Sequence, residues 1–552
     1  MTGRTPVPPA RPGILSLALS AVLAAGFVAG AVAAAAPAAS GAPRGTASQP
    51  SQGSPSQGSP SQGTAAQGTT FSSPRWVAAF GRVEFGSPTF ATIDGVRAVV
   101  AVTLTGLVEV RNAATGAYLP GWPRRVVIKG AKTTWVDSSP AIAYLDGPRR
   151  PPTIIVGAGS LFQRADPANG GLIAFRANGS VRFVFHTKAT FPESGPSSAG
   201  LDDAVFSTPA IGDITGNGQQ DIVFGSYDHY IYALTPAGRL VPGFPVQRAD
   251  TIWSSPALAE VGHTGRDDIF IGGDASGYRD RAGRPCYGGW VTDYRYSPAR
   301  HAPELVWERC IGQTVWSSPA VGVINRGPAN SGGRLAVVVG TSYYPGYASN
   351  PATDEVFAFY ASNGGTVPGW PVRTVGPTFG SPVIAPAVKG GPPLVFSTSC
   401  ARCLAGPSVV SAWSGGGRLI WRNRFDAHSE ALGSPAVVNV TGSGPNDVLV
   451  GNASGVRILS AATGTFLEDT GAAPLEHGCV TDGTPAVGPV PSSAGGPRSG
   501  WLMVFACATE RGGRLVSFAL PAKPDSAPPW PEWRANPQRT GVPDPAAIAR
   551  GR

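Results

Sequence analysis

Short apolar runs alternate with polar turns along most of the chain. Runs such as TIIVGAG, DIVFGS, DIFIGG, AVVVGT and DVLVGN are rich in Val, Ile and Phe and end in small or polar residues. A hairpin and a further strand, such as GLIAFRANG or YIYALTPAG, often follow. β-branched and aromatic runs that are bounded by turn residues indicate strands. The pattern therefore predicts an all-β protein built from repeated antiparallel sheets.

A Ser/Thr-Pro dipeptide marks the start of each repeated unit. Its prolines are Pro88, Pro140, Pro209, Pro256, Pro319, Pro382, Pro435 and Pro485. The intervals range from 47 residues (Pro209 to Pro256) to 69 residues (Pro140 to Pro209). Four strands in a unit of this size are typical of a propeller blade. We predict a single β-propeller over residues 71–545 with eight four-stranded blades, or with seven if one anchor does not begin a blade.

The two ends of the repeat array complement each other. The last unit lacks a clear fourth strand, whereas RWVAAF, residues 75–80, precedes the first anchor and belongs to no unit. Ring closure removes the exposed sheet edges that favour aggregation. We therefore expect the N-terminal run to complete the last blade.

The N-terminal 70 residues differ in composition from the rest of the chain. Arg4 and Arg11 precede an apolar run from Ile14 to Ala36, which small residues follow. This order predicts a signal peptide over residues 1–40, either cleaved near Ala38 or retained as an anchor. SQGSP-like repeats over residues 41–70 predict a disordered linker. With no second membrane-length apolar run, we expect a secreted, extracellular protein that has no stable membrane span after cleavage.

Charge and cysteine content narrow the class of protein. The chain has 43 Lys and Arg against 34 Asp and Glu, and no run of basic residues is longer than a pair. We therefore expect no nucleic-acid binding. Six cysteines in an exported chain favour disulfides, of which the simplest pairing joins Cys286 to Cys310, Cys400 to Cys403, and Cys479 to Cys507. Other connectivities stay open on sequence alone.

Several motifs resemble known propeller repeats. The D-x-x-x-x-G-x-x-D turns and the runs that begin with Asp and end with Gly resemble FG-GAP or VCBS repeats, as in integrin α-chains. Val110 to Trp122 and Ile458 to Phe466 are similar to the tryptophan-docking repeat of quinoprotein (PQQ) propellers, and Trp530 to Gly541 resembles a segment of such proteins. The resemblance implies a propeller fold but no single function, because propellers carry many unrelated activities.

The turn GDITGNGQQD is the best candidate for a metal site. Alternate oxygen-bearing residues surround a glycine that permits a tight turn: Asp213, Thr215, Asn217, Gln219 and Asp221. Such spacing predicts calcium, which binds oxygen ligands. Thr215 stands where integrin-type loops carry an acidic ligand. The alternative is a hydrogen-bonded turn without metal.

Catalytic motifs are few. A PQQ enzyme often carries adjacent cysteines, which this chain lacks, and Cys400-Ala-Arg-Cys403 is followed by Leu404 rather than the His of haem attachment. Neither GxSxG nor HExxH occurs, and Asp228-His229 is expected at a hairpin tip. We therefore expect no PQQ cofactor, assign no catalytic residue, and expect a protein without enzymatic activity.

The position three residues before each anchor proline predicts a ligand-binding rim around the central funnel. The aromatic and acidic residues there are Phe85, Asp137, Phe206, Trp253, Trp316, Phe379 and Asp482, with Leu432 in the remaining unit. We call the seven aromatic and acidic residues, without Leu432, the funnel rim. Insertions at 160–168, 274–288, 342–353 and 399–407 are expected on the same face. Aromatic rings bind flat or sugar-like ligands, and the alternative is packing between blades.

These observations predict a secreted, monomeric, non-catalytic binding or scaffold module. Its expected partner is an extracellular protein or glycan. One alternative is an enzyme, either a PQQ-dependent dehydrogenase or a polysaccharide-acting propeller. Another is an adhesion-like module in which calcium only stiffens the blades.

Overall fold

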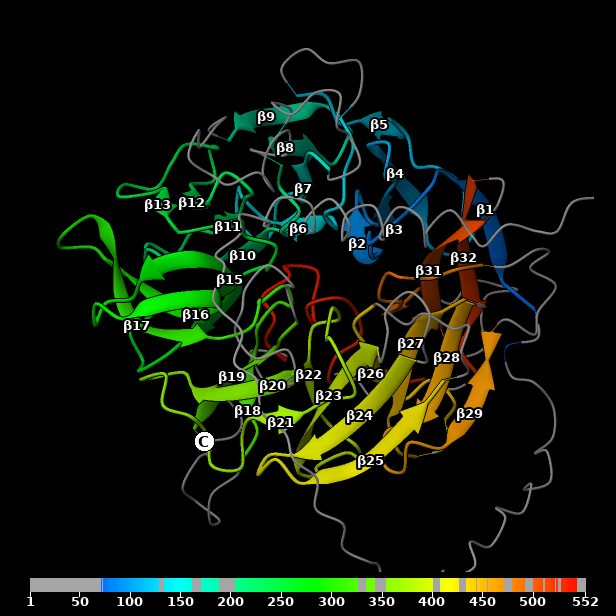
Figure 1. Cartoon of the computed structure of the whole chain (residues 1–552). Helices are drawn as coiled ribbons and strands as arrows, with labels where there is room; N and C mark the ends of the chain where they lie inside the picture. The colour runs from blue at the N-terminus through cyan, green and yellow to red at the C-terminus, as the bar shows by residue number, and fades with distance from the viewer. Residues whose placement is uncertain are drawn as a thin grey trace, which may run out of the picture.

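The computed structural model describes residue 71 and residues 73–543, with gaps at 129–133, 161–169, 188–203, 326–333, 343–353, 401–407, 426–432, 443, 454, 471–478, 492–499, 510–511, 522 and 525–527. Eight four-stranded antiparallel sheets surround a central axis (Figure 1). These residues form no α-helix, and none of them builds a helix that could cross a membrane. The eight-bladed prediction is confirmed, and the alternative of seven blades is wrong. The predicted signal peptide and linker, Cys403 and Leu432 lie outside the described residues.

In each of the first four blades the strands run in chain order from the axis outward. Blade 1 has β2 (Thr89–Ile93), β3 (Val96–Val102), β4 (Leu107–Asn112) and β5 (Arg124–Arg125). Blade 2 has β6 (Ala141–Ala143), β7 (Thr153–Ala158), β8 (Gly171–Arg176) and β9 (Val181–His186). Blade 3 has β10 (Ala210–Gly212), β11 (Asp221–Gly225), β12 (Tyr230–Leu234) and β13 (Val246–Gln247). Blade 4 has β14 (Ala257–Glu260), β15 (Asp267–Arg279), β16 (Pro285–Ser297) and β17 (Ala302–Ile311).

The remaining blades follow the same order, except for the last strand of the ring. Blade 5 has β18 (Ala320–Val323), β19 (Leu335–Gly340), β20 (Glu355–Tyr360) and β21 (Val372–Arg373). Blade 6 has β22 (Val383–Pro386), β23 (Pro393–Cys400), β24 (Ser408–Ser414) and β25 (Leu419–Arg424). Blade 7 has β26 (Ala436–Val438), β27 (Asp447–Asn452), β28 (Gly455–Ser460) and β29 (Phe466–Asp469). Blade 8 has β30 (Ala486–Pro489), β31 (Trp501–Thr509), β32 (Gly512–Ala519) and β1 (Trp76–Phe80).

The N-terminal strand closes the ring. β1 pairs antiparallel with β32, from Trp76 opposite Ser517 to Phe80 opposite Gly513. The last blade therefore takes its outermost strand from the start of the propeller, as the sequence predicts. Opening the ring would break a whole strand pairing, so the two ends of the chain stabilise one another.

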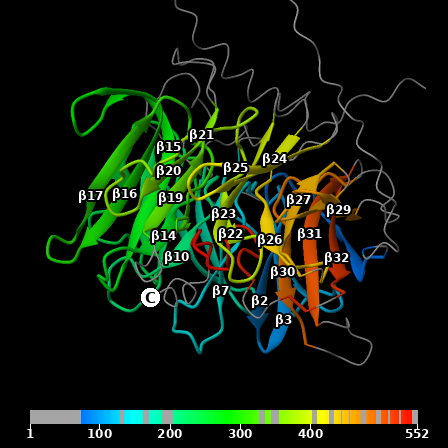
Figure 2. The same cartoon turned by 90° about the horizontal axis from the view of Figure 1, so that it is seen from below.

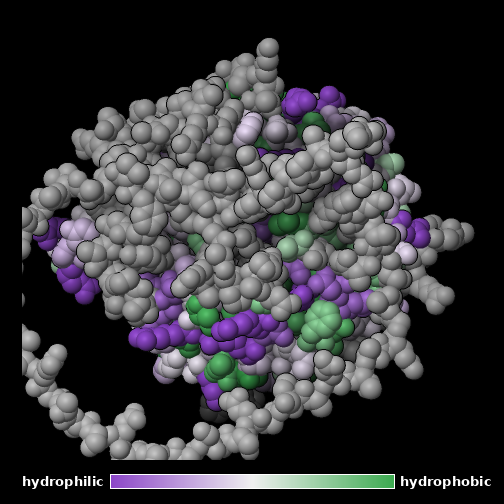
Figure 3. Space-filling model, turned by 45° about the vertical axis from the view of Figure 1, so that its right-hand side comes forward, coloured by the Kyte–Doolittle hydropathy of each residue, from purple (hydrophilic) through white to green (hydrophobic). Residues whose placement is uncertain are grey.

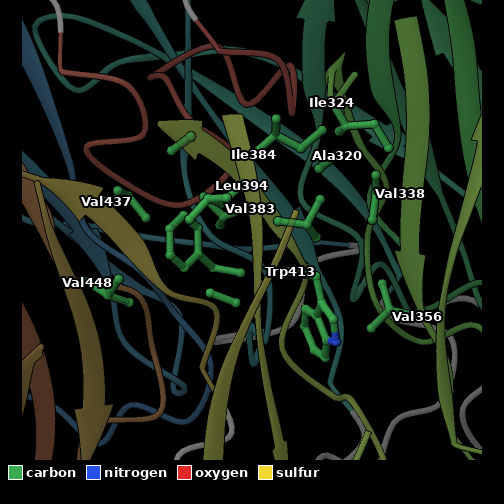
Figure 4. Packing of buried hydrophobic residues seen from close by; sticks show 14 of the residues in the cluster. Ala320, Ile324, Val338, Val356, Val383, Ile384, Leu394, Trp413, Val437 and Val448 are labelled. Carbon is green, nitrogen blue, oxygen red and sulfur yellow. The ribbon is translucent and has the colours of Figure 1, made fainter. Parts of the chain in front are cut away.

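Apolar side chains fill the space between neighbouring blades. Figure 4 shows one such cluster, in which Val338 of blade 5, Leu394 and Trp413 of blade 6, and Val448 of blade 7 pack together. The second strand of blades 2, 3, 6 and 7 is buried along its whole length, because neighbouring blades cover both of its faces. This explains why these runs are continuously apolar rather than alternating.

A belt of hydrogen bonds links the anchor motifs. The hydroxyl oxygen of one anchor Ser or Thr accepts the backbone N–H of its equivalent in the preceding blade, in the pairs Ser139 with Ser87, Thr208 with Ser139, Ser255 with Thr208, Ser318 with Ser255, Ser381 with Ser318, Ser434 with Ser381, and Ser87 with Thr484. At the remaining junction, the Thr484 hydroxyl donates to the carbonyl of Ser434 at 2.9 Å. The repeated Ser/Thr thus joins the blades, and the proline after it leaves no N–H unpaired at the start of the strand.

Tryptophans dock neighbouring blades on the outer side. In five pairs the indole N–H of one blade donates to a backbone carbonyl of the next, namely Trp76 to Ala113, Trp122 to Ala177, Trp307 to Ala361, Trp370 to Gly415, and Trp421 to Ala461. The ring of Trp421 lies against Gly464, whose φ is +71° and where an added Cβ would come within 2.4 Å of the ring. Gly464 is therefore required for two reasons: its left-handed backbone conformation favours glycine, and any side chain would collide with the Trp421 ring.

The segment Trp530–Val542, here called the axial segment, runs through the centre of the ring (red in Figures 1 and 2). In six blades, the backbone N–H of the residue two positions after the anchor proline donates to a carbonyl of this segment. The pairs, at 2.8–2.9 Å, are Val437 with Trp530, Val487 with Pro531, Ile142 with Pro537, Ile211 with Gln538, Leu258 with Thr540, and Val321 with Gly541. The innermost strands turn an edge without a neighbouring strand toward the axis. The axial segment satisfies that edge, which would otherwise leave buried donors unmet.

Two buried arginines of the axial segment bind the anchor prolines. Arg539 donates from Nε to the carbonyl of Pro140 at 2.9 Å and from Nη2 to Pro88 at 3.3 Å, and it forms an ion pair with buried Glu532. Arg534 donates to the carbonyls of Pro256 and Pro319. Burial lowers the pKa of Arg534 to about 9 and that of Arg539 to about 10, so both stay charged at neutral pH. Four of the eight anchors are thus held by two side chains.

Blade 4 is extended by long strands and a disulfide. β15 and β16 have 13 residues each, and Cys286 of β16 is bonded to Cys310 of β17. Figure 2 shows these strands reaching beyond those of the neighbouring blades. A second disulfide joins Cys479 to Cys507 in blade 8. Two of the three predicted pairs are confirmed, and the third includes Cys403, which lies outside the described residues.

Candidate ligand-binding site on the funnel rim

The five aromatic residues of the funnel rim form one continuous series of ring contacts. The ring centroids are 5.3 Å apart for Phe85 and Phe206, 5.1 Å for Phe206 and Trp253, 5.0 Å for Trp253 and Trp316, and 5.3 Å for Trp316 and Phe379. Phe85 belongs to blade 1 and Phe206 to blade 3, so the series passes over blade 2. The rings from five blades therefore meet close to the axis.

All five rings are partly exposed, while the anchors next to them are buried. Each ring precedes the anchor by three residues, with the belt of Ser and Thr beneath it and the axial segment deeper in the ring. The rim rings therefore lie at one end of an axis that the belt and the axial segment occupy. Figure 3 shows that apolar and polar residues are interspersed on the part of the surface that it colours.

The two tryptophans direct their indole N–H groups into one buried polar network. Trp316 donates to Asp274 Oδ2 at 3.0 Å, and Trp253 donates to the Thr251 hydroxyl at 3.2 Å. Thr251 in turn donates to the same Asp274 oxygen at 3.2 Å. One carboxylate thus orients both rings, which are stacked with 24° between their planes.

Asp274 is a site residue that sequence reasoning did not single out. It is 7% exposed, and its Oδ1 atom has no hydrogen-bond partner among the described residues. Burial raises the pKa of Asp274 well above its ordinary value, and the charge of Asp250 raises it further. The available signal was its position at the start of the 274–288 insertion, which the sequence places on the face of the rim.

Tyr227 extends the aromatic surface beneath Phe206 and Trp253. Its ring centroid is 6.3 Å from that of Phe206 and 5.1 Å from that of Trp253. The hydroxyl is buried and has no hydrogen-bond partner in the described part of the chain. Burial raises the pKa of Tyr227 well above its ordinary value, and the nearby charges of Asp137 and Asp274 add to this. The neighbouring Asp228-His229 forms the turn before β12, as expected for a hairpin tip.

The two predicted rim carboxylates lie deeper than the aromatic rings. Asp137 is 2% exposed and accepts a hydrogen bond from Ser160 at 3.0 Å, and Asp482 is 7% exposed. Their positions before the anchors hold them inside the ring wall rather than on the open surface.

The predicted calcium turn joins β10 to β11. Asp213 Oδ1 accepts the N–H of Gly216 at 2.7 Å and of Asn217 at 3.2 Å, and Oδ2 accepts the N–H of Gly218 at 2.6 Å. Gln219 is exposed, and its N–H donates to Asn217 Oδ1 at 2.8 Å. Backbone amides thus occupy the oxygens of the first predicted ligand, as in a hydrogen-bonded Asx turn.

Equivalent turns in other blades repeat this hydrogen bond. Glu260 accepts the N–H of Gly265 at 2.9 Å in blade 4, and Asn439 accepts that of Gly442 at 2.7 Å in blade 7. The recurrence at three blades shows that the first side chain of the turn stabilises the loop itself. Among the described residues, no three His, Cys, Asp or Glu side chains converge on a metal position.

Carboxyl groups nevertheless lie close together at the turn of blade 3. The Thr215 hydroxyl donates to Asp221 Oδ2 at 3.2 Å, whereas buried Asp221 Oδ1 has no partner in the described structure. The pKa of Asp221 is raised to about 7, mainly by burial and also by Asp213. The same causes raise the pKa of Asp267 to about 7. Asp213 and Asp221 of blade 3 and Asp267 of blade 4 therefore bring three carboxyl groups to the junction of two blades.

Comparison with known proteins leaves the family open. No family model matches the chain, and no curated protein matches it. BamB from Moraxella catarrhalis is 12% identical, with a TM-score of 0.47 over 81% of this chain and 99% of that one. The computationally designed Ika8 protein is 12% identical, with a TM-score of 0.44 over 80% and 98%. The C-terminal WD40 domain of Sif2 is 11% identical, with a TM-score of 0.45 over 81% and 97%.

Similarity at this level assigns no activity and no partner to this chain. The propeller fold itself is established by the eight sheets and the closure of the ring. The FG-GAP, VCBS and quinoprotein resemblances stay predictions, because no family model matches.

Proposed function

We propose that this protein is a non-catalytic, extracellular binding module whose ligand site is the funnel rim. The observation that carries the proposal is the unbroken series of five partly exposed aromatic rings. A rigid frame that presents aromatic faces is suited to recognition. The belt and the axial segment fix the positions of the rings before any ligand arrives, which lowers the entropic cost of binding.

A glycan fits this surface better than a protein partner does. Stacked aromatic planes offer flat apolar faces to the C–H faces of sugar rings, and the buried polar network lies at their edge. Trp253 and Trp316 are the two largest and best aligned of these planes. Two disulfides, Cys286–Cys310 and Cys479–Cys507, support an oxidising, extracellular location.

Alanine substitution of Trp316 tests the binding role. We expect Trp316→Ala to weaken glycan binding at least about tenfold, since stacking at a hot spot is worth about 2 kcal/mol or more. Affinity electrophoresis or calorimetry against a panel of soluble glycans measures the effect. Phe466→Ala is the matched control, because Phe466 is a 54% exposed ring on blade 7 away from the rim.

The competing interpretation is that the rim rings only pack the blades. In that case Trp316→Ala would lower the melting temperature strongly, and Trp316→Phe would restore it without any glycan being bound by either form. If the wild type retains no glycan of the panel, the proposal is wrong.

We propose in addition that the Asp213–Asp221 turn takes up Ca²⁺ and stiffens blade 3. The supporting observation is the excess of carboxyl groups there, including the unpaired Asp221 Oδ1 atom. Asp213, Thr215, Asn217, Gln219 and Asp221 would supply the oxygen ligands, after the amide bonds to Asp213 rearrange. The FG-GAP resemblance points in the same direction.

Calcium titration provides the test. We expect millimolar Ca²⁺ to raise the melting temperature of the wild type and to have no effect on Asp213→Ala. Asp94→Ala, at an exposed turn of blade 1, serves as control. An unchanged wild-type melting temperature would show that the turn is held by hydrogen bonds alone.

A further inference from the structure

We propose that the funnel rim selects glycans that carry a free amino group, that is, a protonated ammonium on the sugar. The inference rests on the proposed function of the rim, which it narrows from glycans in general to cationic ones. It depends on three features of the described residues: the orientation of the tryptophans, the position of Asp274, and the contrast with other acidic and aromatic clusters in the same chain.

The tryptophan faces at the rim are electron-rich. An aromatic face attracts cations through its quadrupole, and Trp does so most strongly. The N–H of Trp316 donates to a carboxylate, and the N–H of Trp253 donates to a threonine that is bound to the same carboxylate. Both faces are therefore better suited to a cation than to a neutral ligand.

Asp274 places a buried carboxyl group at the edge of the tryptophan rings, without a cation among the described residues to stabilise its charged form. It forms no ion pair with Lys, Arg or His of the described structure, and its Oδ1 atom has no partner there. The ionisable groups that interact with it are Asp250 and Tyr227, and Asp137 in turn interacts with Tyr227; all three are acidic. Burial raises the pKa of Asp274 well above its ordinary value, and a cation that arrives at the rim favours the charged form of this carboxyl group.

Elsewhere this chain supplies its own cation to such clusters. Glu109 pairs with Arg111, whose guanidinium lies 3.8 Å from the centre of the Tyr118 ring. Glu308 pairs with Arg248, whose guanidinium lies 4.1 Å from the centre of the Trp290 ring. Each cluster combines a carboxylate, an aromatic face and an arginine.

A third cluster of the same kind lies in blade 7. Asp469 pairs with Arg457, whose guanidinium lies 4.7 Å from the centre of the Phe425 ring. At the rim the carboxylate and the aromatic faces are present, and no Lys or Arg of the described residues lies over these rings. The geometry assigns the missing positive charge to the ligand.

Calorimetry with two matched oligosaccharides tests the inference. A trimer of glucosamine and a trimer of N-acetylglucosamine differ only in the amine, which is protonated in the first at pH 6. We expect the wild type to bind the glucosamine trimer at least about tenfold more tightly, which corresponds to about 1.4 kcal/mol. Asp274→Asn is expected to remove this preference and to leave the affinity for the acetylated trimer within about twofold.

Controls separate this inference from the function on which it rests. Asp280→Asn, at the tip of the same β15–β16 hairpin, removes a carboxylate that already pairs with Arg284 and is expected to keep the preference. Equal binding of both trimers, or a preference that survives in Asp274→Asn, overturns the inference and leaves the rim as a glycan site. If neither trimer binds, the inference is wrong, and the wider glycan panel decides the proposed function. Should Asp274→Asn not fold, Trp316→Phe, which lacks the indole N–H, is expected to reduce the preference.

Discussion

Removal of residues 530–552 is expected to abolish cooperative folding of the propeller. The axial segment accepts the N–H groups of six innermost strands. Each buried donor that loses its partner costs about 1–3 kcal/mol. Six such losses match or exceed the stability of a typical domain, which is about 5–15 kcal/mol. The truncated chain should therefore show no sharp thermal transition in calorimetry.

A single substitution gives a graded form of the same experiment. Arg539→Leu leaves the carbonyls of Pro88 and Pro140 without their donor and Glu532 buried without its ion-pair partner. We expect a loss of about 3–5 kcal/mol, as is typical when one member of a buried ion pair is removed. Denaturant unfolding measures the loss, and Arg239→Leu, at an exposed turn of blade 3, is the matched control.

A truncated chain that melts like the wild type would show that the blades need no axial segment.

Asp293→Asn is expected to stabilise the protein increasingly as the pH rises. Asp293 lies on β16 opposite Phe270 and Trp307, is fully buried, and has no partner for either carboxyl oxygen among the described residues. The neighbouring Arg295 is bonded to Asp268 instead, with 2.8 Å between Nε and Oδ1. Burial, with a smaller effect of the Asp268 charge, raises the pKa of Asp293 from 3.8 to about 9.

The direction of the pH effect follows from this shift. The folded state keeps Asp293 protonated up to a pH of about 9, whereas the unfolded chain releases the proton near pH 4. The stability of the wild type is therefore greatest below the unfolded pKa and falls between these values, by up to about 1.4 kcal/mol per pH unit. Asparagine does not ionise, so the variant lacks this decline.

Urea unfolding at pH 5 and pH 8 provides the measurement. The advantage of Asp293→Asn over the wild type should be larger at pH 8. Asp94→Asn is the control, since Asp94 is exposed and has a φ of +48°, which asparagine tolerates. The same advantage at both pH values would mean that Asp293 ionises normally in the folded protein.

Local sequence patterns predicted much of the fold because each blade repeats the same local rules. The Ser/Thr-Pro anchor marks all eight innermost strands, each of which begins one residue after its proline. The N-terminal run, residues 75–80, was predicted to complete the last blade because that blade has one strand too few and the run belongs to no other blade. It forms β1 of blade 8. The cysteine pairs of blades 4 and 8 followed from proximity in sequence.

The candidate site was only partly predictable. The rim aromatics were found because they keep a constant distance from the anchor. Asp274 and Tyr227 were missed because neither occupies that register, and they join the rim only when β15 and the turn before β12 reach the axis. Contacts of this kind depend on the radius of the ring, which no local pattern encodes.

By itself, the sequence predicted eight blades with seven as the alternative, the strand order within a blade and the common register of the rim residues, because these follow from a repeated period; the tertiary structure decided for eight blades. Only the tertiary structure revealed that the Ser/Thr hydroxyls form a continuous belt and that Arg534 and Arg539 fill the axis. Both features join residues that are far apart in the chain, and they exist because a closed ring brings eight equivalent edges together around buried backbone groups that must be paired.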